Sequence, residues 1–224
     1  MRVRRRRALE GLTPKEAIRA QARLAQELVV RGTLPRRIRR IAGVDCSPAP
    51  DGTLHACVVV CAGPAWEVEE VALAGAEPAM PYVPGLLSFR EAPVVLEALR
   101  SIRSEPDVML VDGQGIAHPR GVGLASHLGL HLDVPTIGVG KSRLCGTHDE
   151  PGPTRGDQSA LMLNGTRIGT VLRTRDGVKP VYVSPGHRLG QRPAVRAVLA
   201  AAPRYRLPEP IRQADMRSRR HARA

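Results

Sequence analysis

Two aspartates stand in apolar surroundings where a carboxylate is costly. Asp45 lies inside the run Ile41–Cys46, and Asp112 ends the run Val108–Asp112. Burying an ionised carboxylate costs several kcal/mol unless a cation or hydrogen bonds compensate for the lost water. A turn would also explain Asp112, because Gly113 follows it, but the residues around Asp45 favour a strand. Both carboxylates are therefore candidates for chemistry.

If the two strands are neighbours, both carboxylates emerge at one edge of a sheet, where they could hold a divalent cation. Carboxylate oxygens suit Mg²⁺, which commonly takes one or two carboxylates together with water and substrate phosphates. A Mg²⁺ ion beside a phosphodiester is the setting for metal-assisted hydrolysis of nucleic acid. The residues alone therefore indicate a metal-dependent nuclease, with turn-forming aspartates as the open alternative.

The charge balance points to a nucleic-acid partner. Lys and Arg number 34 against 21 Asp and Glu, a formal net charge of +13, and a strongly basic chain is typical of nucleic-acid-binding proteins. Only three of the 34 are lysines, so an arginine bias from codon composition is an alternative explanation. Part of the excess lies at the two ends of the chain. We expect basic tails over residues 1–10 and 217–224, which are either solvated or bind phosphates.

Length and composition exclude several classes of protein. The chain has 224 residues, of which 42% are hydrophobic and 25% are charged, and it is predicted to form a single domain over residues 11–216. This composition excludes a wholly disordered chain and a fibre. No run approaches the roughly 18 apolar residues of a membrane helix. The cysteines form no CxxC pair, and the first residues contain no apolar signal segment. We therefore expect a cytoplasmic protein without a membrane partner.

The surrounding pattern predicts the elements that must position the two aspartates. A capping box of Thr13 and Glu16 begins a helix that ends near Val30, and Gln21 interrupts its apolar face. The other predicted elements are strands over 41–46, 54–62 and 66–73, a helix over 86–102, a strand over 108–112, a helix over 122–132, a strand over 136–140, a polar loop over 146–165, a hairpin of 167–173 with 178–184, and helices near 193–201 and 208–218.

The order of these elements predicts the fold class. Three consecutive β-rich runs separated by Pro, Asp and Gly are typical of an antiparallel meander. The apolar runs 108–112 and 136–140 are typical of strands buried on both faces of a parallel sheet. We therefore expect a single-domain α/β fold that contains a sheet of mixed direction and flanking helices.

One segment cannot be interpreted from periodicity. Met80-Pro-Tyr-Val-Pro-Gly-Leu-Leu-Ser-Phe-Arg-Glu91 closely resembles the signature of the endonuclease V family, the deoxyinosine-directed repair nucleases. The resemblance runs from residue 13 to 216 and implies a ribonuclease H-like fold, which the predicted elements permit. Further blocks resemble that family in the same order, namely Ala42–Asp45, Val111–Arg120, Gly123–Gly129, Asp133–Val139 with Lys141, and Gly186–Arg188.

The resemblance implies roles for the charged residues. Asp45 and Asp112 match the family's Mg²⁺ ligands, and Glu91 matches the third acidic member of the centre. Asp215 matches a C-terminal helix position where family members carry a carboxylate or a histidine, which acts directly or through water. Lys141 matches a catalytic position near the scissile phosphate, with a solvated loop lysine as the alternative. The implied cofactor is Mg²⁺, for which Mn²⁺ substitutes.

The resemblance also implies how a lesion is recognised. Pro81, Tyr82, Val83 and Pro84 resemble the wedge that separates the strands, in which the tyrosine ring can fill the space of an extruded base. A core aromatic is the alternative for the tyrosine. His118 matches a phosphate or strand contact. The implied lesion pocket consists of Gly85, Leu87, Gly113 and Gly123, for which turn glycines and a core leucine are the alternatives.

The expected function is that of a DNA repair endonuclease for deoxyinosine, which is deaminated adenine. It would hydrolyse the second phosphodiester bond 3′ to the lesion and leave 3′-hydroxyl and 5′-phosphate ends. The alternatives are an inosine-specific endoribonuclease and a non-catalytic nucleic-acid-binding relative, and a basic protein without a nucleic-acid role is a third. Gln114 stands where family members also carry His or Asn, so substrate preference stays open. The expected partner is deoxyinosine-containing DNA, or inosine RNA, bound by a monomer.

Overall fold

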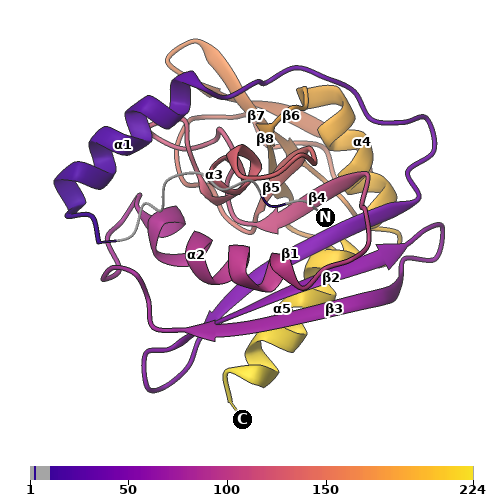
Figure 1. Ribbon diagram of the computed structural model, residues 1–224. Coiled ribbons are helices and arrows are strands. Elements are labelled where there is room, and N and C mark those ends of the chain that lie inside the picture. The colour runs from indigo at the N-terminus through magenta and orange to yellow at the C-terminus, as the bar shows by residue number, and fades with distance from the viewer. Residues whose placement is uncertain (1–2, 4–10, 224) are drawn as a thin grey trace.

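A computed structural model describes residues 3 and 11–223, in which eight strands form one mixed sheet with helices on both faces (Figure 1). The elements in chain order are α1 (Pro14–Gln26), β1 (Arg40–Pro48), β2 (Leu54–Ala62), β3 (Glu67–Ala76), α2 (Leu87–Arg100), β4 (Val108–Asp112), α3 (Leu124–Leu130), β5 (Thr136–Gly140), β6 (Gln158–Leu163), β7 (Thr166–Leu172), β8 (Val181–His187), α4 (Gln191–Ala201) and α5 (Glu209–His221). The strand order is β3-β2-β1-β4-β5-β8-β7-β6. β4 pairs in parallel with β1 on one side and with β5 on the other, whereas all the other pairs are antiparallel.

Two apolar layers hold the helices against the sheet, because alternate residues of each strand face opposite sides. On one side, α2 and α3 pack on residues such as Met109 and Val111. On the other side, α4 and α5 pack on residues such as Ile41 and Leu110 (Figure 1). Among the described residues, no helix is both long and apolar enough to cross a membrane. The expected single-domain α/β fold with a mixed sheet is confirmed.

Helix α1 is shorter than its apolar pattern predicts. The capping box of Thr13 and Glu16 is present, but the helix ends at Gln26 instead of near Val30. After that point the backbone bonds to a distant segment: the Val29 N–H donates to His187 Nδ1, and the Arg188 N–H donates to the Val29 carbonyl. These tertiary bonds replace the last predicted turn of the helix.

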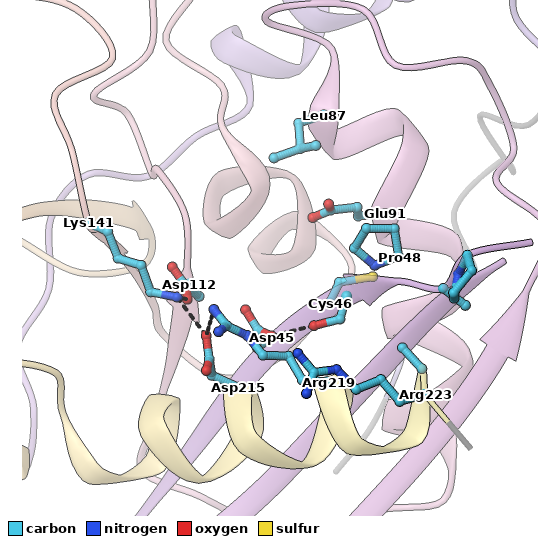
Figure 2. A pocket seen from close by; sticks show the side chains of 14 residues that line it. Asp45, Cys46, Pro48, Leu87, Glu91, Asp112, Lys141, Asp215, Arg219 and Arg223 are labelled. Carbon is cyan, nitrogen blue, oxygen red and sulfur yellow. Dashed lines mark hydrogen bonds and ion pairs between the residues drawn. The ribbon is translucent and has the colours of Figure 1, made fainter. Parts of the chain in front are cut away.

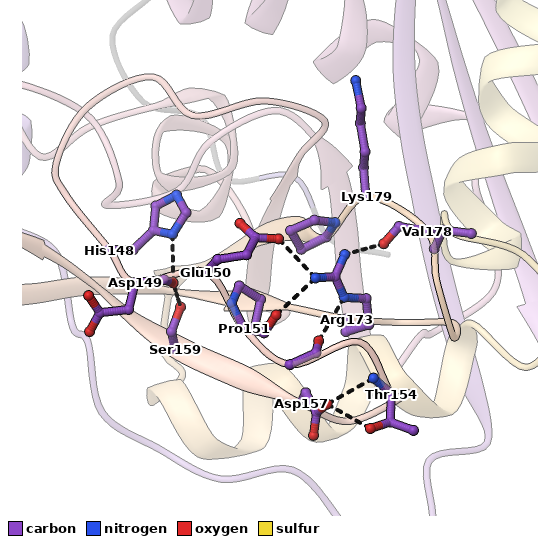
Figure 3. Close-up of polar contacts among 12 residues, drawn as sticks. His148, Asp149, Glu150, Pro151, Thr154, Asp157, Ser159, Arg173, Val178 and Lys179 are labelled. Atoms are coloured by element: carbon purple, nitrogen blue, oxygen red, sulfur yellow. Dashed lines mark hydrogen bonds and ion pairs between the residues drawn. The ribbon is translucent and has the colours of Figure 1, made fainter.

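The predicted loop over 146–165 contains the sixth strand, so that prediction is wrong in its second half. Its first half is held in place by the buried guanidinium of Arg173, which lies just after β7. Arg173 donates to the carbonyls of Pro151 and Gly152, each at 2.9 Å, and to the Glu150 carboxylate at 2.8 Å (Figure 3). The order of this segment therefore depends on a residue outside it, which local composition does not show.

The two predicted tails have different outcomes. Residues 1–10 lie outside the described part of the chain except for Val3, which forms a single bridge with Leu132. The predicted C-terminal tail over 217–224 is wrong for most of its length, because α5 continues to His221. Ser218 and Ala222 are buried and extend the inner face of this helix, so these residues belong to the domain.

Candidate active site

Asp45 and Asp112 lie on two neighbouring central strands, β1 and β4, toward the same end of this parallel pair. The parallel register pairs Val44 with Val111, so the residues that follow, Asp45 and Asp112, lie side by side. Both line a pocket of about 690 Å³, which Figure 2 shows from close by. Their strands are therefore neighbours, which is the condition under which the two carboxylates could hold one cation.

A third carboxylate comes from α5. One oxygen each of Asp45, Asp112 and Asp215 lie within 4.8 Å of one another, which is close enough for one cation to contact all three. We refer to these three residues as the acidic cluster. Gly43 allows the helix to approach, because a Cβ there would lie 2.2 Å from the Pro210 carbonyl in the first turn of α5. Only glycine permits such a close contact between β1 and the helix backbone.

Lys141 and Arg219 neutralise part of the charge of the cluster. The Lys141 ammonium lies 2.5 Å from Asp112 Oδ2 and 2.7 Å from Asp215 Oδ1, and Arg219 lies 2.9 Å from the same Asp215 oxygen (Figure 2). Burial lowers the pKa of Lys141, but hydrogen bonds and charges from the two aspartates outweigh burial and leave this pKa raised. Lys141 is thus a protonated member of the site, held by two carboxylates.

Glu91 lies across the same pocket, on α2. It lines the cavity with the acidic cluster but is not one of the three residues whose oxygens lie within 4.8 Å of one another. Burial raises the pKa of Glu91 to about 8, and the charge of Asp45 adds to this effect. The structure therefore places this predicted ligand on the opposite wall, as Figure 2 shows.

The electrostatics of the cluster fit a hard divalent cation. Burial and, to a smaller extent, the charge of Asp112 raise the pKa of Asp45 to about 7, although a hydrogen bond from Ser218 lowers it. All the donor atoms of the acidic cluster are carboxylate oxygens, which suit Mg²⁺ or Mn²⁺ better than softer metals. A bound divalent ion would remove the repulsion that keeps these groups from ionising.

Protons and a metal ion compete for the carboxylates of this site, and the melting temperature of the protein should show this competition. Folding raises the pKa of Asp45 and of Glu91. At pH values between the ordinary and the raised pKa, the folded protein therefore holds more protons than the unfolded chain. The free energy of unfolding must then fall as the pH rises through this range. We expect Mg²⁺ to raise the melting temperature more at about pH 9 than at about pH 6. Differential scanning fluorimetry with Mg²⁺ and with EDTA measures both shifts. Equal Mg²⁺-induced shifts of the melting temperature at the two pH values would contradict the assignment of these carboxylates to a metal site.

The predicted wedge forms the loop between β3 and α2. The Tyr82 side chain is 66% exposed, whereas Val83 packs against the cluster of apolar residues under α1. Pro81 and Pro84 flank them and are exposed. The alternative of a core aromatic does not fit Tyr82, because its ring lies in solvent on an anchored loop.

The four residues of the predicted lesion pocket fall into two pairs, Gly85 with Leu87 and Gly113 with Gly123. Leu87 begins α2 and lines the cavity of the acidic cluster. Gly85 lies two residues before Leu87 in a left-handed conformation, with φ at +78°, which favours glycine. Gly113 follows Asp112 and faces Leu124, the residue after Gly123. Gly113 and Gly123 thus lie near each other, and of the four predicted residues Leu87 is the one that lines the cavity of the acidic cluster.

Two side chains that sequence reasoning did not assign, the buried Gln21 and the half-buried Arg120, hold the Gly85 backbone. The Gly85 carbonyl accepts from Arg120 Nη2 at 2.7 Å and from Gln21 Nε2 at 3.2 Å, and Gln21 also donates to the Val122 carbonyl at 2.6 Å. Gln21 therefore ties the wedge loop to the residue before Gly123. Its signal in the sequence is a polar residue within the apolar face of α1.

His118 lies beneath the same carbonyl. It is buried, its Nε2 is 3.1 Å from the Gly85 oxygen, and its Nδ1 accepts from the Arg120 N–H at 3.1 Å. Burial lowers the pKa of His118 to about 4, and the Arg120 charge adds to this, so the ring is neutral. In this position it supports the loop, and its predicted contact with DNA stays a prediction.

Replacing Gln21 by leucine should destabilise the protein. The substitution leaves two backbone carbonyls and one arginine without their amide partner, at a cost of about 1–3 kcal/mol in the free energy of unfolding. Gln26→Leu, on the exposed last turn of the same helix, is the matched control. Urea denaturation measures both variants. Equal stabilities would show that the Gln21 bonds do not matter.

Three carboxylates and a lysine at the edge of a mixed sheet, in a strongly basic chain, define a nuclease-type acidic centre on an α/β domain. The family model for endonuclease V matches residues 22–216, and the chain belongs to that family of nucleases. The resemblance seen in the signature segment is therefore confirmed.

Individual relatives agree over nearly the whole chain. Endonuclease V of Nostoc punctiforme is 49% identical over 204 residues, 91% of this chain and 92% of the relative. The crystal structure of endonuclease V from Streptomyces avermitilis has a TM-score of 0.91 at 39% identity, covering 99% of this chain and 97% of the other. A Ciona intestinalis endonuclease V in complex with a 24mer DNA containing an inosine followed by a ribo-adenosine has a TM-score of 0.81 at 25% identity, covering 92% and 96%.

Proposed function

We propose that this chain recognises deoxyinosine in DNA and hydrolyses the second phosphodiester bond 3′ to it with the help of Mg²⁺. The observation that carries the proposal is the convergence of the acidic cluster and Lys141 in one pocket, beside a loop that presents an exposed aromatic ring. The Ciona relative supports the choice of lesion, since it is bound to DNA that contains an inosine.

The acidic cluster would hold the metal, and Glu91 would complete its surroundings from the opposite wall. When bound, Mg²⁺ lowers the pKa of an attacking water and neutralises charge on the leaving oxygen. Lys141 adds a fixed positive charge that attracts and orients the phosphate. The products would be 3′-hydroxyl and 5′-phosphate ends.

Recognition would precede cleavage at the neighbouring loop. Tyr82 is free to enter the stack and take the place of the extruded base. Gly85, Gly113 and Gly123 would offer backbone groups to the base edge. Leu87, which lines the pocket of the acidic cluster, would offer an apolar contact between the base and the metal centre. The length of the DNA strand that spans the distance from the lesion pocket to the acidic cluster would then determine which bond on the 3′ side is cleaved.

A second candidate is an inosine-specific endoribonuclease. The Ciona complex favours it, because the inosine in that DNA is followed by a ribonucleotide. Both candidates use the same acidic cluster and differ only in the sugar that the site accepts.

A gel assay separates these functions. One labelled duplex with a single deoxyinosine is incubated with Mg²⁺ or EDTA, beside a matched inosine RNA and an undamaged duplex. A Mg²⁺-dependent nick on the 3′ side of the lesion in DNA supports the first proposal. Cleavage of the RNA alone selects the second. Lesion binding without any product would contradict both and indicate a non-catalytic relative.

A further inference from the structure

A buried hydroxyl on α5 contacts a carboxylate of the acidic cluster. Ser218 lies one helical turn after Asp215, so the two side chains are neighbours on the helix surface. Ser218 is 0% exposed, and its hydroxyl donates to Asp45 Oδ2 at 2.5 Å. One helix thus supplies both a carboxylate of the cluster and a hydrogen bond to a second carboxylate.

A second hydroxyl, on β1, completes the contact. Ser47 follows Asp45 by two residues and lies on the same face of the strand. Its Oγ is 2.8 Å from Ser218 Oγ and 3.4 Å from Asp45 Oδ2. Since each hydroxyl has one proton, both are used when Ser47 donates to Ser218 and Ser218 donates to Asp45. Ser47 therefore acts on Asp45 chiefly through Ser218.

Packing alone does not account for a serine at this position. Ser218 lies on the buried face of α5 between Ala214 and the capping residue Ala222, two buried residues that have no hydroxyl. Its hydroxyl makes three contacts, with Asp45, with Ser47 and with the Asp215 carbonyl at 3.1 Å. All three partners belong to the acidic cluster or to the strand that carries it.

We propose that Ser218 is a positioning residue of the metal centre, which holds the Asp45 carboxylate through Oδ2 and leaves Oδ1 to bind the ion. This inference rests on the proposed function, because it requires that the cluster binds a divalent cation. A carboxylate that is already oriented loses less freedom when the metal binds. Loss of such an orienting partner typically costs about 10- to 100-fold in metal affinity.

The test is Ser218→Ala, with Ser126→Ala as the matched control. Ser126, on α3, is also 0% exposed, and its hydroxyl has no hydrogen-bond partner within the described ranges of the chain. Mn²⁺ binding to the free protein is measured by isothermal titration calorimetry, and melting temperatures are measured in EDTA. We expect Ser218→Ala to weaken Mn²⁺ binding by about 10- to 100-fold. The control should bind Mn²⁺ as the wild type does.

Unchanged Mn²⁺ affinity in Ser218→Ala would overturn the inference. So would a lower melting temperature in EDTA together with unchanged affinity, because that result assigns Ser218 a purely structural role. Failure of the premise that the acidic cluster binds a divalent cation gives a different result, since the wild-type protein would then bind no Mn²⁺ at all.

Ser47→Ala provides a second arm. Because Ser47 acts mainly through Ser218, its loss should weaken Mn²⁺ binding less than the loss of Ser218. The double variant should bind Mn²⁺ no more weakly than Ser218→Ala alone, since the two residues act in series. Additive losses would contradict this order of contacts.

Discussion

Asp45→Asn should lower the rate of cleavage by at least about 1000-fold, or about 4 kcal/mol of transition-state stabilisation. The substitution keeps the shape of the side chain and an oxygen for Ser218, but it removes one negative charge from the acidic cluster. Single-turnover cleavage of the deoxyinosine duplex in saturating Mg²⁺ measures the rate. Binding to the lesion should persist, because the wedge and the glycine pocket lie on other elements.

The same variant separates chemistry from folding. Burial and the charge of Asp112 raise the pKa of Asp45, so the neutral asparagine removes a cost that the folded wild type bears when it is ionised. In EDTA at about pH 9 the variant should therefore melt at or above the wild-type temperature. Glu97→Gln, an exposed residue of α2, is the control for removal of a negative charge. Cleavage by Asp45→Asn at the wild-type rate would rule out this carboxylate as a metal ligand.

Tyr82→Ala should reduce discrimination between damaged and undamaged DNA. A base–aromatic stack contributes about 1–3 kcal/mol, so we expect the ratio of the two dissociation constants to fall about 5- to 150-fold. The ring is largely exposed and makes little contribution to the core, so the protein should remain as stable as the wild type. Fluorescence anisotropy in EDTA measures both dissociation constants without cleavage.

Two further variants control this result. Tyr82→Phe keeps the ring and should retain most of the discrimination, because stacking does not need the hydroxyl. Leu73→Ala removes another exposed apolar side chain, 43% exposed on the edge strand β3, and should leave the ratio unchanged. If Tyr82→Ala discriminates as well as Leu73→Ala, the loop is not a wedge.

The elements around the acidic cluster were predictable because their signals are local. The strands at 54–62, 108–112 and 136–140 coincide with their apolar runs, since a strand buried on both faces excludes polar residues. Asp45 and Asp112 were found for the same reason, as carboxylates in apolar runs. The strand β6 was missed because its start is polar and its pairing with β7 is a tertiary property.

The supporting residues of the site were not predictable from local pattern. Ser218 lies in an arginine-rich stretch that resembles a solvated tail, and only the packing of α5 on β1 shows that it is buried. Gln21 was visible as a break in an apolar face, but its partners Gly85 and Val122 lie far along the chain. A local pattern can thus show that a polar side chain is unusual, but it does not show which distant backbone groups that side chain binds.

The strand order has a consequence for when activity arises during folding. The acidic cluster joins β1, β4 and α5, so its carboxylates come from the beginning, the middle and the end of the described chain. Contacts between such distant segments form late, because the loops between them must first be closed. During refolding from denaturant, the capacity to bind Mn²⁺ should therefore return only in the last kinetic phase. A partly folded chain would bind nucleic acid through its arginines but would be unable to cut it.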